Sequence, residues 1–234
     1  SSSAKLAAVV KANAYGLGIK EVAATLSREG CTIFFVATLD EGIELRQILP
    51  NARIYVFHGV LSGTAKELVA HSLIPVLNSL EQIENWLPHA DHPAALHIDT
   101  GMSRLGLTPE ECDKIPFITS YNIDLVMSHL SCAEDKNHPK NSQQLSLFEK
   151  LRKFVPSQYA SLAASSGIFL GTDYHFDLCR AGICLYGINP TPLSQNPLTQ
   201  VVRLQAKIIQ IRYVDTPQTV GYGASHREMK PTKI

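Results

Sequence analysis

A lysine directly follows the first apolar run of the sequence. Residues 7–10 read Ala-Ala-Val-Val, Lys11 comes next, and Tyr15 lies four residues later. An amine at the end of a buried strand projects into a region that is partly shielded from water. Desolvation there disfavours the ammonium form and leaves a nucleophilic amine suited to Schiff-base chemistry. Lys11 is also explained as a surface lysine whose side chain extends past the strand end so that its charge reaches solvent. Tyr15, taken alone, is typical of a packed aromatic residue with a hydrated hydroxyl.

Polar residues also follow later apolar runs. The stretches "SSG" at 165–167 and "RAGI" at 180–183 offer hydroxyls, small residues and backbone N–H groups, which are the ingredients of a nest for one phosphate. Glycine-containing turns are common after strands, so neither stretch indicates phosphate by itself. Arg104 and His129 follow two further runs, and a histidine in such a place is also typical of a hydrogen-bonded structural residue.

The elements that must position these residues are short apolar runs that alternate with amphipathic stretches. The runs predict eight strands, at 6–10, 33–37, 54–57, 74–77, 94–98, 123–127, 159–163 and 181–185. Helices are predicted at 19–30, 40–49, 62–71 and 142–154, and two more begin at the capping patterns of Ser79 and Thr108. Every connection contains a crossover, so the strands are expected to be parallel, in a closed (β/α)8 TIM-type barrel of the α/β class. An open doubly wound sheet is the alternative.

The pattern of apolar and polar residues changes after a Pro- and Asn-rich linker, "NPTPLSQNP". Residues 201–214 alternate β-branched with polar residues and have no helix attached, which is typical of a separate β domain. We therefore assign residues 1–198 to the barrel and 199–234 to the beginning of a C-terminal β domain. The sequence opens almost inside a strand and stops as another apolar run begins, so we expect a piece of a longer polypeptide.

Composition excludes several classes of protein. The 234 residues carry 21 Lys and Arg against 21 Asp and Glu, so no net charge draws the chain to nucleic acid or to an anionic membrane. The five cysteines form no C-x-x-C pattern, which argues against a disulfide framework or a zinc site and favours the reducing cytoplasm. No apolar stretch is long enough for a membrane span or has the flanks of a signal peptide.

Taken together, the stretches that carry these residues resemble one family, the alanine racemases, which are pyridoxal-phosphate enzymes with a barrel and a C-terminal β domain. They occur in the family's order along nearly the whole chain, and the lysine stretch and the "DTGM-x-RLG" stretch are the most specific. The matching stretches are "AVVKANAYG" (8–16), "IDTGMSRLG" (98–106), "MSHLSCAED" (127–135), "AASSG" (163–167), "RAGICLYGINP" (180–190) and "VGYGASH" (220–226).

The resemblance implies a role for each site residue. Lys11 carries pyridoxal 5'-phosphate covalently and is one of two proton-transfer bases, while Arg180 faces the pyridine nitrogen of the cofactor. Arginine cannot accept a proton, so that nitrogen stays unprotonated, which suppresses transamination and decarboxylation. Arg104 orients the substrate carboxylate and a cofactor oxygen, and His129 hydrogen-bonds Arg180 and stacks near the cofactor ring. The cofactor phosphate is held by Tyr15, Ser165 and the backbone amides of Gly182 and Ile183, with Ser166 as a neighbour.

The implied activity is the interconversion of L-alanine and D-alanine through an external aldimine and two-base proton transfer, supplying D-alanine for bacterial peptidoglycan. The family forms homodimers in which the C-terminal domain of the other subunit completes the active site, and a tyrosine of that domain is the second base. The "GYADG"-like stretch that holds this tyrosine is absent from the sequence, and Tyr222 belongs to an earlier motif. No metal, nucleic acid or membrane partner is implied.

The sequence departs from the family at several positions. His97 stands where many members have a lysine, often carbamylated, that pairs with the arginine at position 104, so another group such as an anion must orient Arg104. Leu17 replaces a common histidine, and the family's first helix is absent.

Three other interpretations stay open. A pyridoxal-phosphate carrier shares the barrel and the lysine, but it is a lone barrel, and the β segment after residue 198 argues against it. A fragment that binds the cofactor without turnover is a second possibility. A decarboxylase of basic amino acids is a third, although such enzymes place an acidic residue where Arg180 stands.

Overall fold

Eight short parallel strands form one sheet in the computed structural model of the chain, which describes residues 3–115, 118 and 120–234. Each strand is four residues long or close to it and is rich in Val, Ile, Leu, Phe and Ala, as expected for strands covered on both faces. The strands are β1 (Lys5–Val9), β2 (Ile33–Val36), β3 (Arg53–Val56), β4 (Ile74–Leu77), β5 (Ala94–His97), β6 (Ile123–Met127), β7 (Tyr159–Ser161) and β8 (Leu178–Ala181).

The sheet closes on itself. The strand order is β7-β6-β5-β4-β3-β2-β1-β8, so the first strand pairs with both the second and the last. β7 and β8 meet through a parallel bridge between Ala164 and Arg180, and the Arg180 N–H donates to the Ala163 carbonyl at 2.9 Å. The predicted (β/α)8 barrel is therefore confirmed, and the open doubly wound sheet is wrong.

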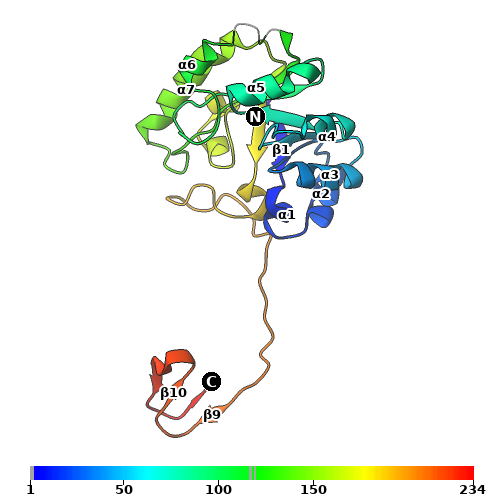
Figure 1. The fold of residues 1–234 in the computed structure, drawn as a ribbon. Coiled ribbons are helices and arrows are strands. Elements are labelled where there is room, and N and C mark those ends of the chain that lie inside the picture. The colour runs from blue at the N-terminus through cyan, green and yellow to red at the C-terminus, as the bar shows by residue number, and fades with distance from the viewer. Residues whose placement is uncertain (1–2, 116–117, 119) are drawn as a thin grey trace. The chain divides into compact units, whose positions relative to one another are not determined.

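Helices cover the outside of the barrel, as Figure 1 shows. Two of their starts have the predicted caps: Thr108 forms a complete capping box with Glu111, and the Ser79 hydroxyl accepts from the Gln82 N–H. Thr38, which was not predicted as a cap, forms a complete capping box with Glu41. The helices are α2 (Ile19–Arg28), α3 (Leu39–Ile48), α4 (Ala65–Ala70), α5 (Leu80–Trp86), α6 (Pro109–Cys112) and α7 (Pro139–Leu151), and a short turn, α1 (Lys11–Tyr15), follows β1.

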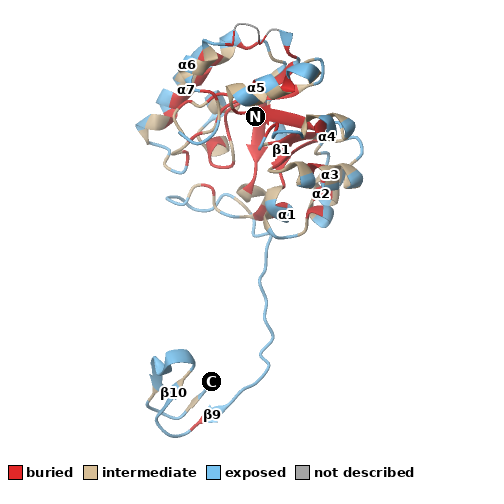
Figure 2. Ribbon diagram, in the orientation of Figure 1, coloured by how far each residue is buried: buried red, intermediate tan, exposed pale blue. Residues whose placement is uncertain are grey.

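The strands separate two apolar cores because successive side chains point to opposite faces. The outer core lies between strands and helices and contains the largest buried side chains, such as Trp86 and Phe148. Figure 2 shows this burial along the strands, with exposed residues on the outer helix faces. The inner core fills the barrel with Ala7, Val9, Ile33, Phe35, Tyr55, Ile74, Val76, Ala95, Leu125, Met127 and Leu178.

A charged cluster lies at the amino ends of the strands. The Arg53 guanidinium and the Tyr55 hydroxyl both donate to the Asp124 carboxylate, and Lys5 Nζ donates to the Tyr159 hydroxyl at 3.0 Å. Asp124 is buried, and its position beside Tyr55 raises the pKa of that phenol, so the phenol stays protonated. This cluster occupies the end of the barrel away from the strand-to-helix loops, and the predicted site residues are not part of it.

The position predicted for the eighth strand is wrong: the strand begins three residues and ends four residues earlier than expected. The strand ends at Ala181, and Ile183–Tyr186 form a 3-10 helix, η6, rather than the strand predicted at 181–185. Gly182, with φ −120° and ψ −101°, takes the chain out of the strand. The connection from β7 to β8 also differs from an ordinary crossover helix, since it contains two 3-10 turns, η4 (Gly167–Phe169) and η5 (Thr172–Tyr174).

The chain divides into two compact units, one up to Val201 and one from Val202 onward. The second unit contains two antiparallel pairs, β9 (Tyr213–Val214) with β12 (Thr232–Lys233) and β10 (Gln218–Val220) with β11 (His226–Glu228). A strand was expected over 201–214, but only its last two residues are assigned to one, because a strand needs a paired neighbour. That this unit begins a larger β domain stays a prediction.

No helix within the described residues has both the length and the apolar character needed to cross a membrane.

Candidate active site

The inward-facing rows of the barrel strands continue past the strand ends into a cavity. Val9, Ala95, Met127 and Leu178 belong to the inner core. Because side chains alternate with a period of two, the residues two positions further along face the same side. Those residues are Lys11, His97, His129 and Arg180, and all four line the cavity.

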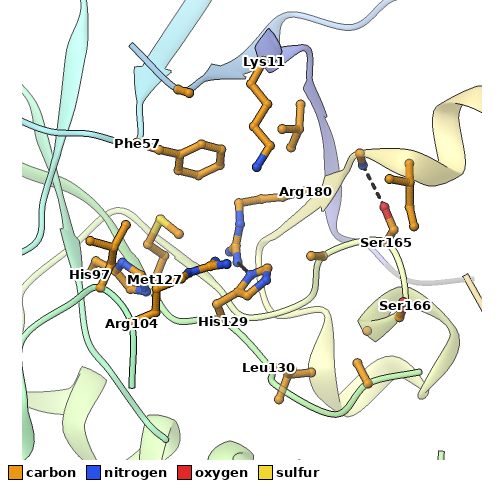
Figure 3. Close-up of a pocket in the computed structure, with 18 of the residues that line it drawn as sticks. Lys11, Phe57, His97, Arg104, Met127, His129, Leu130, Ser165, Ser166 and Arg180 are labelled. Atoms are coloured by element: carbon orange, nitrogen blue, oxygen red, sulfur yellow. Dashed lines mark hydrogen bonds between the residues drawn. The ribbon is translucent and has the colours of Figure 1, made fainter. Parts of the chain in front are cut away.

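The cavity has a volume of about 460 Å³ and lies at the carboxyl ends of the strands. Every residue that the sequence singled out as a site candidate lines it, and Figure 3 shows how Lys11, Arg180, His129 and Arg104 converge on its centre. The lining candidates are Lys11, Tyr15, Arg104, His129, Ser165, Ser166, Arg180, Gly182 and Ile183.

Lys11 and Tyr15 reach the same cavity because the chain between them makes a left-handed turn. Residues Ala12 to Tyr15 have φ between 52° and 57°, a conformation that L-residues with a Cβ rarely adopt. The turn returns the side chain at position 15 to the side of the lysine and ends at Gly16, with φ 87°. Lys11 is half-buried, and its Nζ points toward the cavity between Phe57 and Arg180 (Figure 3).

A small polar cradle lies beside this turn, where β7 and β8 end. The Ser165 hydroxyl accepts hydrogen bonds from the N–H groups of Gly182 (2.9 Å) and Cys184 (3.4 Å). A Cβ built on Gly182 would lie 2.7 Å from the Tyr15 hydroxyl oxygen and 3.6 Å from that of Ser165, so a side chain at this position would require Tyr15 to shift. Burial raises the pKa of Tyr15, which therefore remains a donor at neutral pH. Two hydroxyls and backbone N–H groups at one point suit an anion such as phosphate.

Arg180 lies inside the barrel and is only 1% exposed. Its Nη1 donates to the Ser161 hydroxyl at 2.5 Å, and its Nη2 donates to the carbonyls of Ser128 at 2.6 Å and Leu162 at 3.3 Å. Burial lowers the pKa of the guanidinium to about 10, so it is still charged at neutral pH. Within the described residues its Nε–H and the second N–H of its Nη1 make no hydrogen bond, which leaves two donors available to a ligand.

His129 is neutral. Burial lowers its pKa to about 3, and the charges of Arg180 and Arg104 contribute to the shift. Arg180 Nη2 lies 3.4 Å from His129 Nδ1, and since arginine can only donate, Nδ1 accepts and the ring proton is on Nε2. The imidazole therefore supports the arginine without adding a charge to the cavity.

His97 is neutral too, with the opposite tautomer. The Asn78 amide donates to the carbonyls of Phe57 and Val76, both at 2.8 Å, so its oxygen is the group that faces His97 Nδ1 at 2.8 Å. Nδ1 must therefore carry the proton, and Nε2 carries the lone pair. Burial lowers the pKa of His97 to about 4.

Arg104 is the exposed member of the cavity. Within the part of the chain that the structure describes, its guanidinium makes neither a hydrogen bond nor an ion pair, and it lines the same cavity as His97 and Lys11. A guanidinium in this state is available to a carboxylate, which it binds through two parallel hydrogen bonds.

Two supporting residues were missed by the sequence analysis. Asn78 follows β4 directly, just as polar residues follow the other strands, so the same search for polar residues past apolar runs would have found it. Ser161, which accepts from Arg180 and donates to the Leu178 carbonyl, lies inside β7 and carries no such signal.

Comparisons with known proteins agree with this geometry. The family model described as the alanine racemase N-terminal domain matches residues 1–190. A relative named alanine racemase from Rhodospirillum rubrum is 49% identical over 95% of this chain, and a catabolic alanine racemase from Mesorhizobium japonicum is 48% identical over 97% of it. The chain spans 62% of the length of each of these two relatives.

A solved structure has the same fold. The crystal structure of an alanine racemase from Bartonella henselae, described as having covalently bound pyridoxal phosphate, superimposes with a TM-score of 0.92 at 38% identity. The alignment covers 98% of this chain and 67% of that one. With the family model matching most of its length, the chain belongs to the alanine racemase family.

Proposed function

We propose that this chain forms the cofactor-binding barrel of an alanine racemase, which interconverts L-alanine and D-alanine and supplies D-alanine for peptidoglycan. The observation that carries the proposal is the convergence of a lysine amine, a cradle of hydroxyls and backbone N–H groups, and a buried arginine on one cavity. Covalent binding of pyridoxal phosphate by the Bartonella relative supports the same assignment.

The cavity residues fit pyridoxal phosphate. A side chain at Gly182 would crowd the Tyr15 hydroxyl, so the glycine leaves the hydroxyls of Tyr15 and Ser165 accessible to a phosphate. The free Nε–H of Arg180 suits a ring nitrogen that accepts a hydrogen bond. When bound, the cofactor supplies an aldehyde that condenses with amines and a ring that delocalises the electron pair left at the α-carbon after its proton is removed.

The residues of this chain would then divide the work. Lys11 would hold the cofactor through its Nζ, and its amine, when free, would take or return the α-proton on its side of the cavity. Tyr15, Ser165 and the amides of Gly182 and Ile183 hold the phosphate, and Ser166 lies beside them.

The arginines would set the selectivity of the reaction. Arg180 would donate to the ring nitrogen without protonating it, which would limit charge delocalisation into the ring and disfavour transamination. The neutral His129 keeps Arg180 in place, and Arg104 binds the substrate carboxylate.

We further propose a cytoplasmic homodimer in which the C-terminal domain of the partner subunit supplies the second base. Racemisation requires a proton donor or acceptor on each face of the α-carbon, and Lys11 serves one face only. The second base implied by the family resemblance is a tyrosine. Among the described residues that line the cavity, the one tyrosine is Tyr15, and it already belongs to the phosphate cradle, which supports a base from outside this chain.

The test uses the complete natural polypeptide. Borohydride reduction with pyridoxal phosphate should attach a pyridoxyl group to the peptide that contains Lys11, as located by mass spectrometry. A coupled D-amino-acid oxidase assay should detect D-alanine formed from L-alanine, with L-serine as the second substrate tested. Lys11→Ala should abolish both signals, whereas Lys20→Ala, a change at an exposed lysine of α2, should preserve both. A decarboxylated amine as the only product, or labelling at another lysine, would contradict the proposal.

A further inference from the structure

The turn that carries Lys11 is held in a strained conformation. Four consecutive residues that are not glycine, Ala12 to Tyr15, have positive φ, and each of these conformations costs free energy that the surrounding structure must offset. Within the turn, the Ala14 N–H donates to the Val10 carbonyl at 2.9 Å, and the Asn13 side chain accepts from the Ile19 N–H at 2.7 Å. These bonds join the turn to its own flanks, so a contact from elsewhere is needed to hold it against the barrel.

Glu41 supplies that contact. One of its carboxylate oxygens, Oε1, accepts from the Ala12 N–H at 2.7 Å. The other, Oε2, accepts from the N–H groups of Ala37 at 2.7 Å and Thr38 at 3.3 Å. A single side chain in the first turn of α3 therefore joins the loop after β1 to the loop after β2, beyond the last ladder bond between these strands, from Val10 N–H to the Phe35 carbonyl.

The chemistry of this contact requires a carboxylate. All three groups around Glu41 are N–H donors, and an ionised carboxylate offers acceptors on both oxygens. A glutamine would bring its own N–H₂ against either the Ala12 N–H or the Ala37 N–H, so one of the two loops would lose its partner.

A second capping box in the chain separates this contact from ordinary helix capping. Glu111 at the start of α6 accepts from the Thr108 N–H at 2.9 Å, and its own N–H donates to the Thr108 hydroxyl at 3.2 Å, as Glu41 does with Thr38. Among the described contacts, the Glu111 side chain bonds only its own capping residue. The bond to Ala12 is therefore additional to what a capping box needs.

We propose that Glu41 is a positioning residue for the lysine: it clamps the left-handed turn so that the Lys11 amine and the Tyr15 hydroxyl face one cavity. The role toward the cofactor rests on the proposed function of Lys11. The clamp itself does not, because it is a property of the protein before any ligand binds.

The test compares Glu41→Gln with the matched control Glu111→Gln in the complete polypeptide. Amide hydrogen exchange of residues 10–18, measured without added cofactor, should accelerate at least tenfold in Glu41→Gln and stay within twofold of wild type in Glu111→Gln. Pyridoxal phosphate should bind at least tenfold more weakly to Glu41→Gln only. Equal exchange and equal binding in the two variants would overturn the proposal.

A second variant keeps the test decisive if Glu41→Gln is too unstable to measure alone. Adding Ala12→Gly removes the Cβ that makes a φ of 52° costly, so the double variant should fold and regain much of the cofactor affinity. Failure of this change to restore any affinity would also overturn the clamp. If wild-type protein does not capture pyridoxal phosphate, the proposed function fails, and the exchange data still decide the role of Glu41.

Discussion

Titration of His97 should make the stability of the barrel depend on pH. His97 is 8% exposed, and its pKa lies at about 4, against an ordinary value of about 6.5. Burial is the main cause, the charges of Arg180 and Arg104 add to the shift, and Asp99 opposes it. The Asn78 oxygen fixes the proton on Nδ1, so a second proton would have to enter at Nε2, inside a cavity that already holds cations.

The direction of the effect follows from which state binds the proton. Between pH 6.5 and pH 4 the unfolded chain protonates His97 and the folded chain does not, so lowering the pH favours unfolding. The stabilisation is fully present above the unfolded pKa and is lost as the pH falls toward the folded one. Between pH 7 and pH 5, a shift from about 6.5 to about 4 corresponds to a loss of about 2 kcal/mol in the free energy of unfolding.

Urea unfolding of wild type and His97→Gln at both pH values measures this loss. Glutamine can still donate to the Asn78 oxygen but does not titrate, and the contribution of His129 is present in both proteins. We expect the variant to lose about 2 kcal/mol less than wild type between pH 7 and pH 5, whatever its absolute stability. An equal loss in the two proteins would mean that His97 protonates normally in the fold, and the lowering of its pKa by burial would be refuted.

Two further substitutions test the cavity and the outer core. Gly182→Ala places a Cβ 2.7 Å from the Tyr15 hydroxyl, so it should weaken pyridoxal phosphate binding at least tenfold in a fluorescence titration, and unchanged affinity would exclude the cradle as the phosphate site. Phe148→Ala removes a fully buried ring from α7 and should cost about 3–5 kcal/mol of unfolding free energy in urea, and a loss below about 1 kcal/mol would contradict tight packing of α7 on the barrel.

The strands were predictable because their signal is local. Seven of the predicted runs overlap the observed strands closely, since a strand buried on both faces is a short apolar segment between turn residues. β8 was misplaced because the charged residue Arg180 on its inner face interrupts the apolar pattern expected of a buried strand. The more apolar residues after Gly182 match that pattern better, but they form η6. The start of α7 was placed at Ser142 although Pro139 stands at the first helical position, the usual place for a proline.

The left-handed turn could not have been predicted from its residues. Ala12 and Ala14 favour the right-handed region, and only Asn13 is a residue type that adopts positive φ readily. The conformation is imposed by contacts between residues distant in sequence, such as the hydrogen bond from the Ala12 N–H to Glu41. Local propensity depends only on neighbouring residues and therefore does not predict these contacts. The positions of the site residues could be anticipated for the opposite reason, since polar residues past parallel strands meet at one end of any such barrel.

The charge of the cavity connects its unusual features. Lys11, Arg104 and Arg180 contribute three basic groups, whereas Glu134 is the one carboxylate among the described lining residues. The hydrogen-bond acceptors of Arg180 are carbonyls, a hydroxyl and an imidazole, all neutral, so its buried charge has no counterion among them. Burial lowers the pKa values of His97 and His129, and the same uncompensated charge adds to both shifts. A ligand that carries a phosphate and a carboxylate would supply the missing negative charge, so the energetic cost of assembling this cavity is a reason for it to bind such an anion.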